Sequence, residues 1–296
     1  MSLLVLRAGP SALVQDLGRP GHAAVGVTGS GAADRAAAAL ALRCVGTDPG
    51  AAVLEILLGG FAVMTDAPAV VAVTGAPARL VVTTSSGSLR SAATGEVLAL
   101  PAGATLEIGR PTAGVRTYLA VRGGIDAPAV LGSRSRDTLA GLGSPPVAVG
   151  DVLGVGDLVV GPWAEGWHAA GHEPTPTGGV APVVLDVVPG PRDDLFPAEA
   201  WRILAGIAHV SGHADRVGVR LEPQQPVPRL ASGEIPSEGM VRGAVQVPAD
   251  GAPVVFGPDH PVTGGYPVIG VVTARSADVV SQLLPGTPVT FRRLDV

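Results

Sequence analysis

The chain has 296 residues, a formal net charge of −5 and no cluster of basic residues. This balance argues against a nucleic-acid partner, because a surface that binds nucleic acid has to neutralise phosphates. No apolar run reaches the ~18 residues that a membrane helix needs. The first residues also lack a basic segment ahead of their apolar run, so we expect neither a membrane span nor a signal peptide.

The first half of the chain is predicted to be mostly β-structure around one helix. Asp34–Val45 is rich in alanine and is followed by Gly46, which predicts a helix with a glycine at its C-terminal end. Strand-like runs separated by turn residues recur about every ten residues, which favours a sandwich or barrel over alternating strands and helices. These runs are Leu3–Leu6, Val53–Leu58, Ala69–Thr74, Arg79–Thr83, Glu96–Leu100, Thr105–Ile108, Arg116–Val121 and Asp157–Val160.

Residues 166–182 contain proline and Gly-Gly breaks and little periodicity, so we interpret them as a linker or long loop. Short helices are predicted at Pro197–Ala205 and Ser276–Leu284. The remaining strand-like runs are Val183–Val188, His209–Val210, Val217–Leu221, Gly243–Val247, Val254–Gly257, Val268–Thr273 and Val289–Leu294. The sequence thus predicts one domain over residues 1–165 and a second over 183–296, with a strand exchange between them left open.

The residue types that are missing restrict the chemistry. All 20 basic residues are arginine, and the sequence contains no lysine. A biotinyl-lysine, a Schiff-base lysine and a phosphate-loop lysine are therefore excluded within this chain. The single cysteine, Cys44, excludes an internal disulfide and agrees with a cytoplasmic location. It lies on the apolar face of the predicted helix, where we expect a buried, inert thiol.

Polar groups are concentrated in the stretch 233–272, which we expect to carry the functional site. Ser237-Glu238-Gly239 precedes Gln246 by one short strand. Further along, residues 259–267 place a carboxylate, an imidazole, a hydroxyl and a phenol around Gly264-Gly265. Paired glycines let a ligand approach the main chain closely, and loops on a rigid scaffold often hold catalytic groups. The alternative is a tight turn with a tyrosine packed on its edge.

Two further carboxylates leave alternatives open. Glu55 stands between Leu54 and Ile56 in a predicted strand. It either lines an interior, where burial would raise its pKa toward acid–base use, or faces solvent. Asp215-Arg216 is either a structural ion pair or a site where the arginine binds a carboxylate.

No metal site is expected. His168 and His172 are four residues apart, as are His209 and His213, but both pairs stand in non-helical sequence and neither has the glutamate of a zinc-binding helix motif. The chain also lacks the Gly-x-Ser-x-Gly turn of a serine hydrolase and a Gly-x-Gly-x-x-Gly dinucleotide motif.

Short motifs occur in a fixed order along the whole chain. Near the C-terminus they are Gly243-Ala244-Val245-Gln246-Val247-Pro248, Gly251-Ala252-Pro253, Asp259 and Thr263-Gly264-Gly265-Tyr266-Pro267. Upstream they are Arg7-Ala8-Gly9, Val14-Gln15-Asp16-Leu17-Gly18-Arg19, Gly31-Ala32-Ala33-Asp34, Leu54-Glu55, Thr74-Gly75-Ala76, Tyr118-Leu119-Ala120-Val121-Arg122-Gly123-Gly124, Gly132-Ser133, Pro189-Gly190-Pro191, Asp215-Arg216-Val217-Gly218-Val219-Arg220-Leu221 and Pro285-Gly286. The set resembles the KipA family, which includes the C subunit of 5-oxoprolinase. This family is also labelled allophanate hydrolase subunit 2 or biotin-dependent carboxyltransferase-like.

This sequence departs from the family pattern at two places. Many relatives have glutamine before the Thr-Gly-Gly-Tyr-Pro element, whereas this chain has His260, Pro261 and Val262 there. The family's Ser-Asp-Arg is Ala214-Asp215-Arg216. An amide and a hydroxyl are thus lost and an imidazole is gained.

The resemblance implies a mainly β fold with two cyclophilin-like β-barrel subdomains and a few short helices. It implies a cytoplasmic subunit of an ATP-dependent 5-oxoprolinase, which hydrolyses the lactam of 5-oxo-L-proline to L-glutamate. The expected partners are a KipI-like protein, which is the B subunit of that enzyme, and, as a further one, a LamB/YcsF-like protein, which is its A subunit. The chain alone is expected to be inactive, with ATP bound at the level of the complex.

Two other functions stay open at this point. One is the carboxyltransferase component of a biotin-dependent urea or acyl carboxylase, in which the biotin lies on another subunit. The other is a non-enzymatic regulator of the KipA type, which binds a KipI-like kinase inhibitor.

Amide hydrolysis needs an electrostatic clamp on the amide oxygen or phosphate and a positioned acid or base. Arginine suits bidentate binding of a carboxylate or phosphate. We expect a catalytic group and a substrate-binding group of residues. The catalytic group is Asp259, His260, Tyr266 and Glu55, and the substrate-binding group is Gln246, Thr263, Gly264, Gly265, Arg216 and Ser237.

Overall fold

The computed structural model describes residues 1–164, 181–230 and 233–295, and these form two compact units. The first unit contains Met1–Arg19, Asp34–Asp137 and the chain from Gly141 to residue 164. The second contains Pro20–Ala33, Thr138–Ala140 and the described residues from 181 onward. From the sequence, Pro20–Ala33 and Thr138–Ala140 were predicted to belong to the first domain, whereas the structure groups both with the second unit. The predicted linker lies almost entirely outside the described residues.

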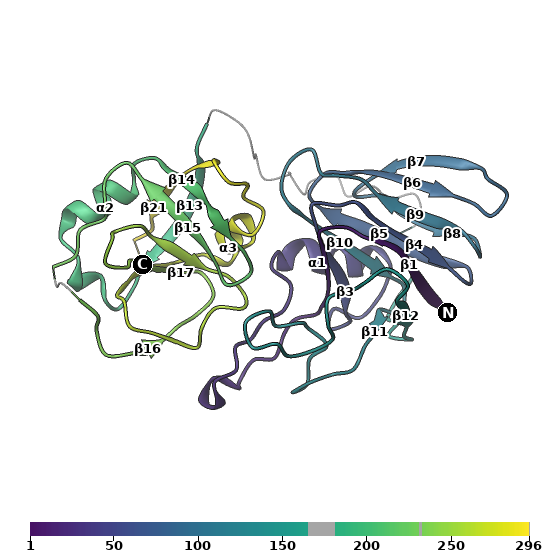
Figure 1. The fold of residues 1–296 in the computed structure, drawn as a ribbon, viewed down its shortest axis with the longest axis horizontal. Coiled ribbons are helices and arrows are strands. Elements are labelled where there is room, and N and C mark those ends of the chain that lie inside the picture. Colours follow the sequence, from purple (N-terminus) through teal and green to yellow (C-terminus); the bar gives the residue numbers. More distant parts are fainter. Residues whose placement is uncertain (165–180, 231–232, 296) are drawn as a thin grey trace. The chain divides into compact units, whose positions relative to one another are not determined.

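The strands of the first unit form two antiparallel sheets (Figure 1). The order is β11-β12-β1-β4-β9-β6-β7 in the larger sheet and β2-β3-β10-β5-β8 in the smaller one. In chain order, the strands are β1 (Ser2–Ala8), β2 (Ser11–Gln15), β3 (Val53–Leu57), β4 (Phe61–Thr65), β5 (Ala69–Gly75), β6 (Arg79–Thr83), β7 (Leu89–Ala93), β8 (Val97–Leu100), β9 (Thr105–Ile108), β10 (Arg116–Val121), β11 (Ile125–Asp126) and β12 (Val152–Val155).

Alternate residues of the two sheets share one apolar core. Leu54 and Ile56 of β3 belong to it, as do Leu3 of β1 and Leu119 of β10. Each fully buried side chain of this size contributes roughly 1.5–3 kcal/mol through the hydrophobic effect. The other face of the smaller sheet is covered by helix α1 (Arg35–Cys44), which contacts β3, β5 and β10. Because both its faces are covered, β10 is buried along its whole length.

Helix α1 begins where the sequence predicts. The Asp34 side chain accepts a hydrogen bond from the Ala37 backbone N–H at 2.9 Å, and it therefore caps the helix. The buried face includes Cys44, whose pKa is raised by burial. The prediction of a buried thiol is confirmed. The raised pKa keeps the thiol uncharged, and an uncharged thiol is a poor nucleophile.

The second unit is built on a closed barrel with the order β13-β20-β17-β18-β15-β14-β21. Its strands are β13 (Val183–Pro189), β14 (Ala208–Ala214), β15 (Gly218–Pro223), β17 (Ala244–Gln246), β18 (Val254–Phe256), β20 (Val268–Val272) and β21 (Pro288–Arg293). Only β13 and β21 pair in parallel among the barrel pairings of the described residues. A separate two-stranded sheet joins β16 (Glu238–Gly239) to β19 (Thr263–Gly264).

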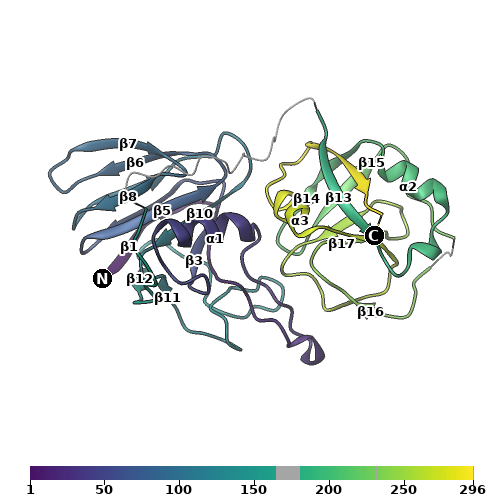
Figure 2. The same ribbon diagram turned by 180° about the vertical axis from the view of Figure 1, so that it is seen from behind.

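Helices α2 (Ala198–Leu204) and α3 (Ala274–Val280) flank the barrel on opposite sides (Figure 2). The 3-10 turns are η1 (Ala23–Val25) and η2 (Asp193–Leu195). Helix α3 begins two residues before the predicted start, because the Thr273 hydroxyl caps it by accepting the Ser276 N–H at 3.2 Å.

The prediction of a mainly β chain with a few short helices is confirmed. The second unit contains a closed barrel, and the first contains two sheets on one core. The predicted strand Asp157–Val160 is wrong: the strand lies earlier, at β12, and Val159 forms only an isolated bridge with Thr47. None of the helices in the described residues is long and apolar enough to cross a membrane.

Candidate functional site

The segment Thr263-Gly264-Gly265-Tyr266-Pro267, here termed the GGYP loop, is held by the two-stranded sheet. Gly264 stands opposite Glu238 in this sheet. Beyond it, the Ile235 N–H donates to the Gly265 carbonyl at 2.7 Å, and the Met240 N–H donates to the Val262 carbonyl at 2.9 Å. Residues 235–240 therefore run antiparallel along the loop and fix its backbone.

Gln246, at the end of β17, supports the same loop from the barrel. Its side chain is buried, and Nε2 donates to the Tyr266 carbonyl at 3.1 Å. The Met240 sulfur lies 4.0 Å from the same nitrogen. A Cβ on Gly264 would stand only 2.6 Å from Gln246 Nε2, so an alanine at this position would displace the Gln246 amide. The predicted binding residue Gln246 thus positions the loop in this structure.

Tyr266 is covered by an arginine that the sequence analysis missed. The Arg229 guanidinium carbon lies 5.7 Å from the centroid of the Tyr266 ring, which is cation–π distance. Arg229 Nη1 also donates to the Gly233 carbonyl at 3.0 Å. Arg229 belongs to no motif, and it stands in a proline-rich stretch that gave no signal of its role.

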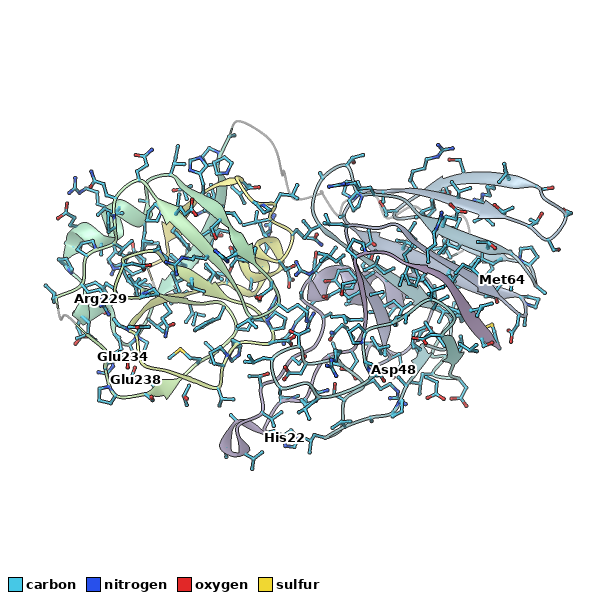
Figure 3. All side chains as sticks on the ribbon, viewed as in Figure 1. His22, Asp48, Met64, Arg229, Glu234 and Glu238 are labelled. Carbon is cyan, nitrogen blue, oxygen red and sulfur yellow. The ribbon has the colours of Figure 1, made fainter. Side chains whose placement is uncertain are left out.

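Two glutamates border the GGYP loop (Figure 3). Glu238 forms an ion pair with Arg192, whose Nε donates to Oε1 at 2.7 Å; hydrogen bonding to this guanidinium lowers the pKa of Glu238. Glu234 lies on the other glycine, with Oε2 3.5 Å from the position that a Cβ of Gly265 would take. The predicted binder Ser237 stands exposed between the two glutamates in the chain.

Asp259 is fully buried and accepts hydrogen bonds at both oxygens. Arg216 donates to it twice, from Nε at 2.8 Å and from Nη2 at 3.0 Å. Ser30 Oγ donates at 2.7 Å, and Thr138 donates from N at 2.9 Å and from Oγ1 at 2.7 Å. Burial raises the pKa of Asp259, but the Arg216 charge and these hydrogen bonds outweigh it, so the pKa is lowered. Asp259 therefore joins three separate chain segments of the second unit.

The ion pair suggested by sequence adjacency, Asp215 with Arg216, does not form. Asp215 instead accepts the N–H groups of Val217 at 2.8 Å and Gly218 at 3.0 Å in an exposed turn. Arg216 points to Asp259, because the Asp259 N–H donates to the Arg216 carbonyl at 3.0 Å and brings the two residues together. Asp215 and Arg216 are neighbours in the sequence, but the turn directs their side chains to different partners.

His260 follows Asp259 and is also buried. Its Nδ1 lies 2.8 Å from the Pro261 carbonyl, and since a carbonyl only accepts, this contact has the proton on Nδ1. The Phe256 ring lies 6.1 Å away in a tilted arrangement. The imidazole is thus held by this hydrogen bond, and His260 follows the buried Asp259 in the chain.

Glu55 belongs to the first unit and is 4% exposed, which decides for the buried alternative. It lies on the helix-covered face of β3, where the Tyr118 hydroxyl donates to Oε2 at 2.9 Å and Arg116 Nε stands 3.5 Å from Oε1. Tyr118 Oη in turn accepts the Asp34 N–H at 2.7 Å. Burial, and then the negative charges of Glu55 and Asp34, raise the pKa of Tyr118 well above its usual value.

One further feature of the second unit lies outside these networks. An open hollow of about 400 Å³ borders the β14–β15 hairpin and includes His213, Asp215 and Arg220. It contains no residue of the GGYP loop. Among the described residues, no group of three or more His, Cys, Asp and Glu side chains is placed to hold a metal ion. His168 and His172 lie outside the described residues.

The structure therefore sorts the predicted site residues into three groups. The GGYP loop, Gln246 and the 235–240 segment come together. Asp259 and Arg216 form a buried clamp, and the buried His260 follows Asp259 in the chain. Glu55 lies in the first unit within its own network. Besides Arg229, the sequence analysis missed Ser30 and Thr138, whose hydroxyls carry no motif and become neighbours of Asp259 only in the fold.

The comparisons with known proteins agree with this architecture. A family described as "Carboxyltransferase domain, subdomain A and B" matches residues 25–293. The chain belongs to this carboxyltransferase domain family. The resemblance predicted from the sequence motifs is thereby confirmed.

Among curated proteins, this carboxyltransferase-family chain is similar to the C subunit of 5-oxoprolinase from Escherichia coli (strain K12). The two are 34% identical over 301 residues, which cover 98% of this chain and 90% of that protein. It is also similar to the urea amidolyase of Saccharomyces cerevisiae, with 30% identity over 301 residues. That match covers 94% of this chain but only 16% of the yeast protein.

Solved structures show the same fold. The crystal structure of TTHA0988 has a TM-score of 0.85 and 34% identity, and the match covers 98% of this chain and 56% of that one. The urea carboxylase of Kluyveromyces lactis has a TM-score of 0.86 and 28% identity, and the match covers 99% of this chain and 27% of that one. The carboxyltransferase-family chain thus spans about half or less of these structural relatives.

Proposed function

We propose that the chain is a subunit of an ATP-dependent 5-oxoprolinase and acts with a KipI-like protein and a LamB/YcsF-like protein. The observation that carries this proposal is the match to the C subunit of 5-oxoprolinase, which covers 98% of this chain and 90% of that protein. The yeast urea amidolyase match involves only 16% of a much larger enzyme. A separate subunit is therefore the better counterpart.

In the proposed reaction, the lactam C–N bond of 5-oxo-L-proline breaks. The hydroxyl of water goes to the carbonyl carbon and a proton goes to the nitrogen, which gives L-glutamate. ATP hydrolysis to ADP and phosphate drives the opening. Because the chain has no lysine and so no phosphate-loop lysine, we place ATP binding at the level of the complex.

The GGYP loop is the part of this chain that we assign to the amide. Tyr266 and Thr263 carry hydroxyls on a loop whose backbone is fixed by β16 and by Gln246. Fixed donors of this kind stabilise the charge that develops on an amide oxygen during attack by water. His260, which precedes the loop in the chain, is the proposed acid or base. Asp259, with its five accepted hydrogen bonds, holds His260 and the start of the loop in place.

The test is glutamate formation from 5-oxo-L-proline and ATP by the purified chain, alone and mixed with its two partner proteins. Activity only in the mixture is the expected result, and Tyr266→Phe in the mixture should lower kcat. A stable complex that never forms glutamate contradicts the proposal and favours a KipA-type regulator.

A second candidate, the carboxyltransferase component of a biotin-dependent urea carboxylase, has support of its own. The family match is to a carboxyltransferase domain, and the Kluyveromyces lactis urea carboxylase shares the fold with a TM-score of 0.86. Because this chain has no lysine, the biotin would be on a partner. Capture of a biotinylated partner on avidin, with the chain bound to it, would favour this candidate over lactam hydrolysis.

A further inference from the structure

The charged side chains around the GGYP loop are not equivalent. Arg192 and Glu238 neutralise each other in an ion pair. Arg229 is half-buried and lies over the Tyr266 ring, and its one hydrogen bond in the described chain is the Nη1 donation to Gly233. No carboxylate of residues 1–164, 181–230 or 233–295 lies within ion-pair distance of Arg229.

In the described part of the second unit, Arg229 and Arg275 are the arginines that form no carboxylate ion pair. The arginines there that form a carboxylate ion pair are Arg192, Arg202, Arg216, Arg220, Arg242, Arg292 and Arg293. Even the exposed Arg202 has Glu199 at 2.5 Å. No carboxylate of the described chain therefore balances the positive charge of Arg229 at the loop. The edge formed by Nε and Nη2 donates no hydrogen bond in the described chain.

The ring below Arg229 limits how its guanidinium can turn. The cation–π contact with Tyr266 and the bond to Gly233 restrain the group and engage Nη1, which leaves Nε and Nη2 as a pair of donors on the other edge. Such a fork matches the two oxygens of a carboxylate. The Arg229 guanidinium is thus half-buried, restrained and without a carboxylate partner in the described chain. These properties suit the binding of an anionic ligand better than a surface ion pair.

A charge of opposite sign borders the same loop. Glu234 is exposed, makes no hydrogen bond within the described residues, and places Oε2 beside Gly265. Figure 3 shows Arg229, Glu234 and Glu238 along one edge of the barrel unit. A ligand lying on the two glycines would therefore meet a cation at Tyr266 and an acceptor at Gly265. This arrangement suits a small molecule that has both a carboxylate and an N–H group.

We propose that Arg229 binds the carboxylate of the substrate and makes the GGYP loop selective for an amide that carries one. The assignment rests on the proposed lactam hydrolysis and specifies the substrate class of the same site. 5-Oxo-L-proline has a carboxylate, a ring N–H and an amide oxygen, whereas urea is neutral and has no carboxylate to pair with Arg229. Arg229 is thus a specificity residue and takes no part in bond breaking.

The experiment uses the chain assembled with its partner proteins and compares Arg229→Gln and Arg229→Lys with the wild type. Arg229→Gln should raise the KM for 5-oxo-L-proline at least tenfold and change kcat less than about twofold, since binding is lost and the chemistry is not. Arg229→Lys should be intermediate, because lysine keeps the charge but loses the fork. The matched control is Arg202→Gln on α2, which should leave KM unchanged.

A second measurement uses 2-pyrrolidinone, the same lactam without the carboxylate, as a competitor of 5-oxo-L-proline. The wild type should bind 2-pyrrolidinone at least tenfold more weakly than 5-oxo-L-proline, and Arg229→Gln should remove this preference. An Arg229→Gln complex that keeps the wild-type KM and the wild-type preference overturns the proposal, while the proposed function stands.

If the wild-type complex forms no glutamate, the proposed function fails and equilibrium binding decides the assignment of Arg229. Saturable binding of 5-oxo-L-proline that is lost in Arg229→Gln and kept in Arg202→Gln would still support a carboxylate site. Equal binding by wild type and Arg229→Gln, or no binding by the wild type, would overturn it.

Discussion

Asp259 and the GGYP loop are four residues apart in the sequence, yet their polar groups are used in opposite ways. Every oxygen of Asp259 is occupied by donors from Arg216, Ser30 and Thr138. Along the loop, Arg229 has no carboxylate and Glu234 no donor within the described residues. The difference teaches that polar groups close together in the sequence divide into a rigid anchor and the edge that we propose binds substrate, and only hydrogen-bond geometry separates them.

The largest effect should come from breaking the anchor. Arg216→Met leaves Asp259 buried without its cation, and loss of one partner of a buried pair costs about 3–5 kcal/mol of unfolding free energy. Denaturant titration of the isolated chain measures this loss. The control is Arg220→Met, whose partner Asp250 is largely exposed, so the loss should be at most about 1 kcal/mol. Equal losses in the two variants would contradict the distinction between anchor and surface pair.

A glycine pair tests the loop with less damage to the barrel. In Gly264→Ala, the new Cβ would stand 2.6 Å from Gln246 Nε2 and displace it from the Tyr266 carbonyl. We expect a loss of about 1–3 kcal/mol, typical of overpacking, together with reduced activity of the assembled complex.

Gly239→Ala lies opposite in the same two-stranded sheet, and its Cβ would meet nothing within 4 Å. It should leave stability and activity near those of the wild type. If both alanines behave alike, Gln246 does not control the loop.

Much of the fold was predictable because its signals are local. The alanine-rich run ending at Gly46 gave α1, and turn residues at short intervals gave most strands. β16 and β19 escaped notice because two-residue strands have no periodicity, and their pairing joins segments about 25 residues apart. The false strand at Asp157–Val160 is apolar enough to be one, but no neighbouring strand pairs with it beyond a single bridge.

For the candidate site, the sequence pointed to the GGYP loop. It did not show which of the polar residues nearby are buried anchors and which stay available to a ligand. Asp259, His260 and Tyr266 look alike as candidates in the sequence, since each is polar and next to glycine or proline. Ser30 and Thr138 approach Asp259 from 229 and 121 residues away, and no spacing rule reports such contacts. Arg229 was missed for the related reason that the role we propose for it depends on its having no carboxylate partner within the described residues.

The two tyrosines of the chain differ in the same way: the hydroxyl of Tyr118, in the first unit, is hydrogen-bonded, whereas no hydrogen bond of the Tyr266 hydroxyl is present in the described chain. Tyr118 is fully buried between Glu55 and the Asp34 N–H, whereas Tyr266 is half-buried. Tyr118→Phe removes one hydrogen bond from each of these two groups and should cost about 1–3 kcal/mol in thermal or chemical unfolding. Tyr266→Phe should cost less, because no hydrogen bond of its hydroxyl is present in the described chain. The raised pKa of Tyr118 predicts that it stays un-ionised in native protein at a pH where free tyrosine ionises.

The smallest effect is the acid sensitivity that Asp259 adds to the chain. Its pKa is lowered in the folded state, so between the folded and unfolded pKa values the unfolded chain binds more protons, and stability rises with pH. The contribution is complete above the ordinary value of 3.8 and is lost as pH falls through the lower folded pKa. Each unit of lowering corresponds to about 1.4 kcal/mol.

Asp66, Asp186, Glu238 and Asp250 also have lowered pKa values, so the wild type alone cannot isolate Asp259. The useful quantity is the difference in unfolding free energy between wild type and Asp259→Asn. The amide does not titrate, and the contributions of the other carboxylates are the same in both proteins and cancel in the difference. This difference should be constant above about pH 5 and shrink only in more acidic solution. A difference that instead shrinks toward neutral pH would mean that Asp259 has a raised pKa. That result would return Asp259 from anchor to the role of a general acid.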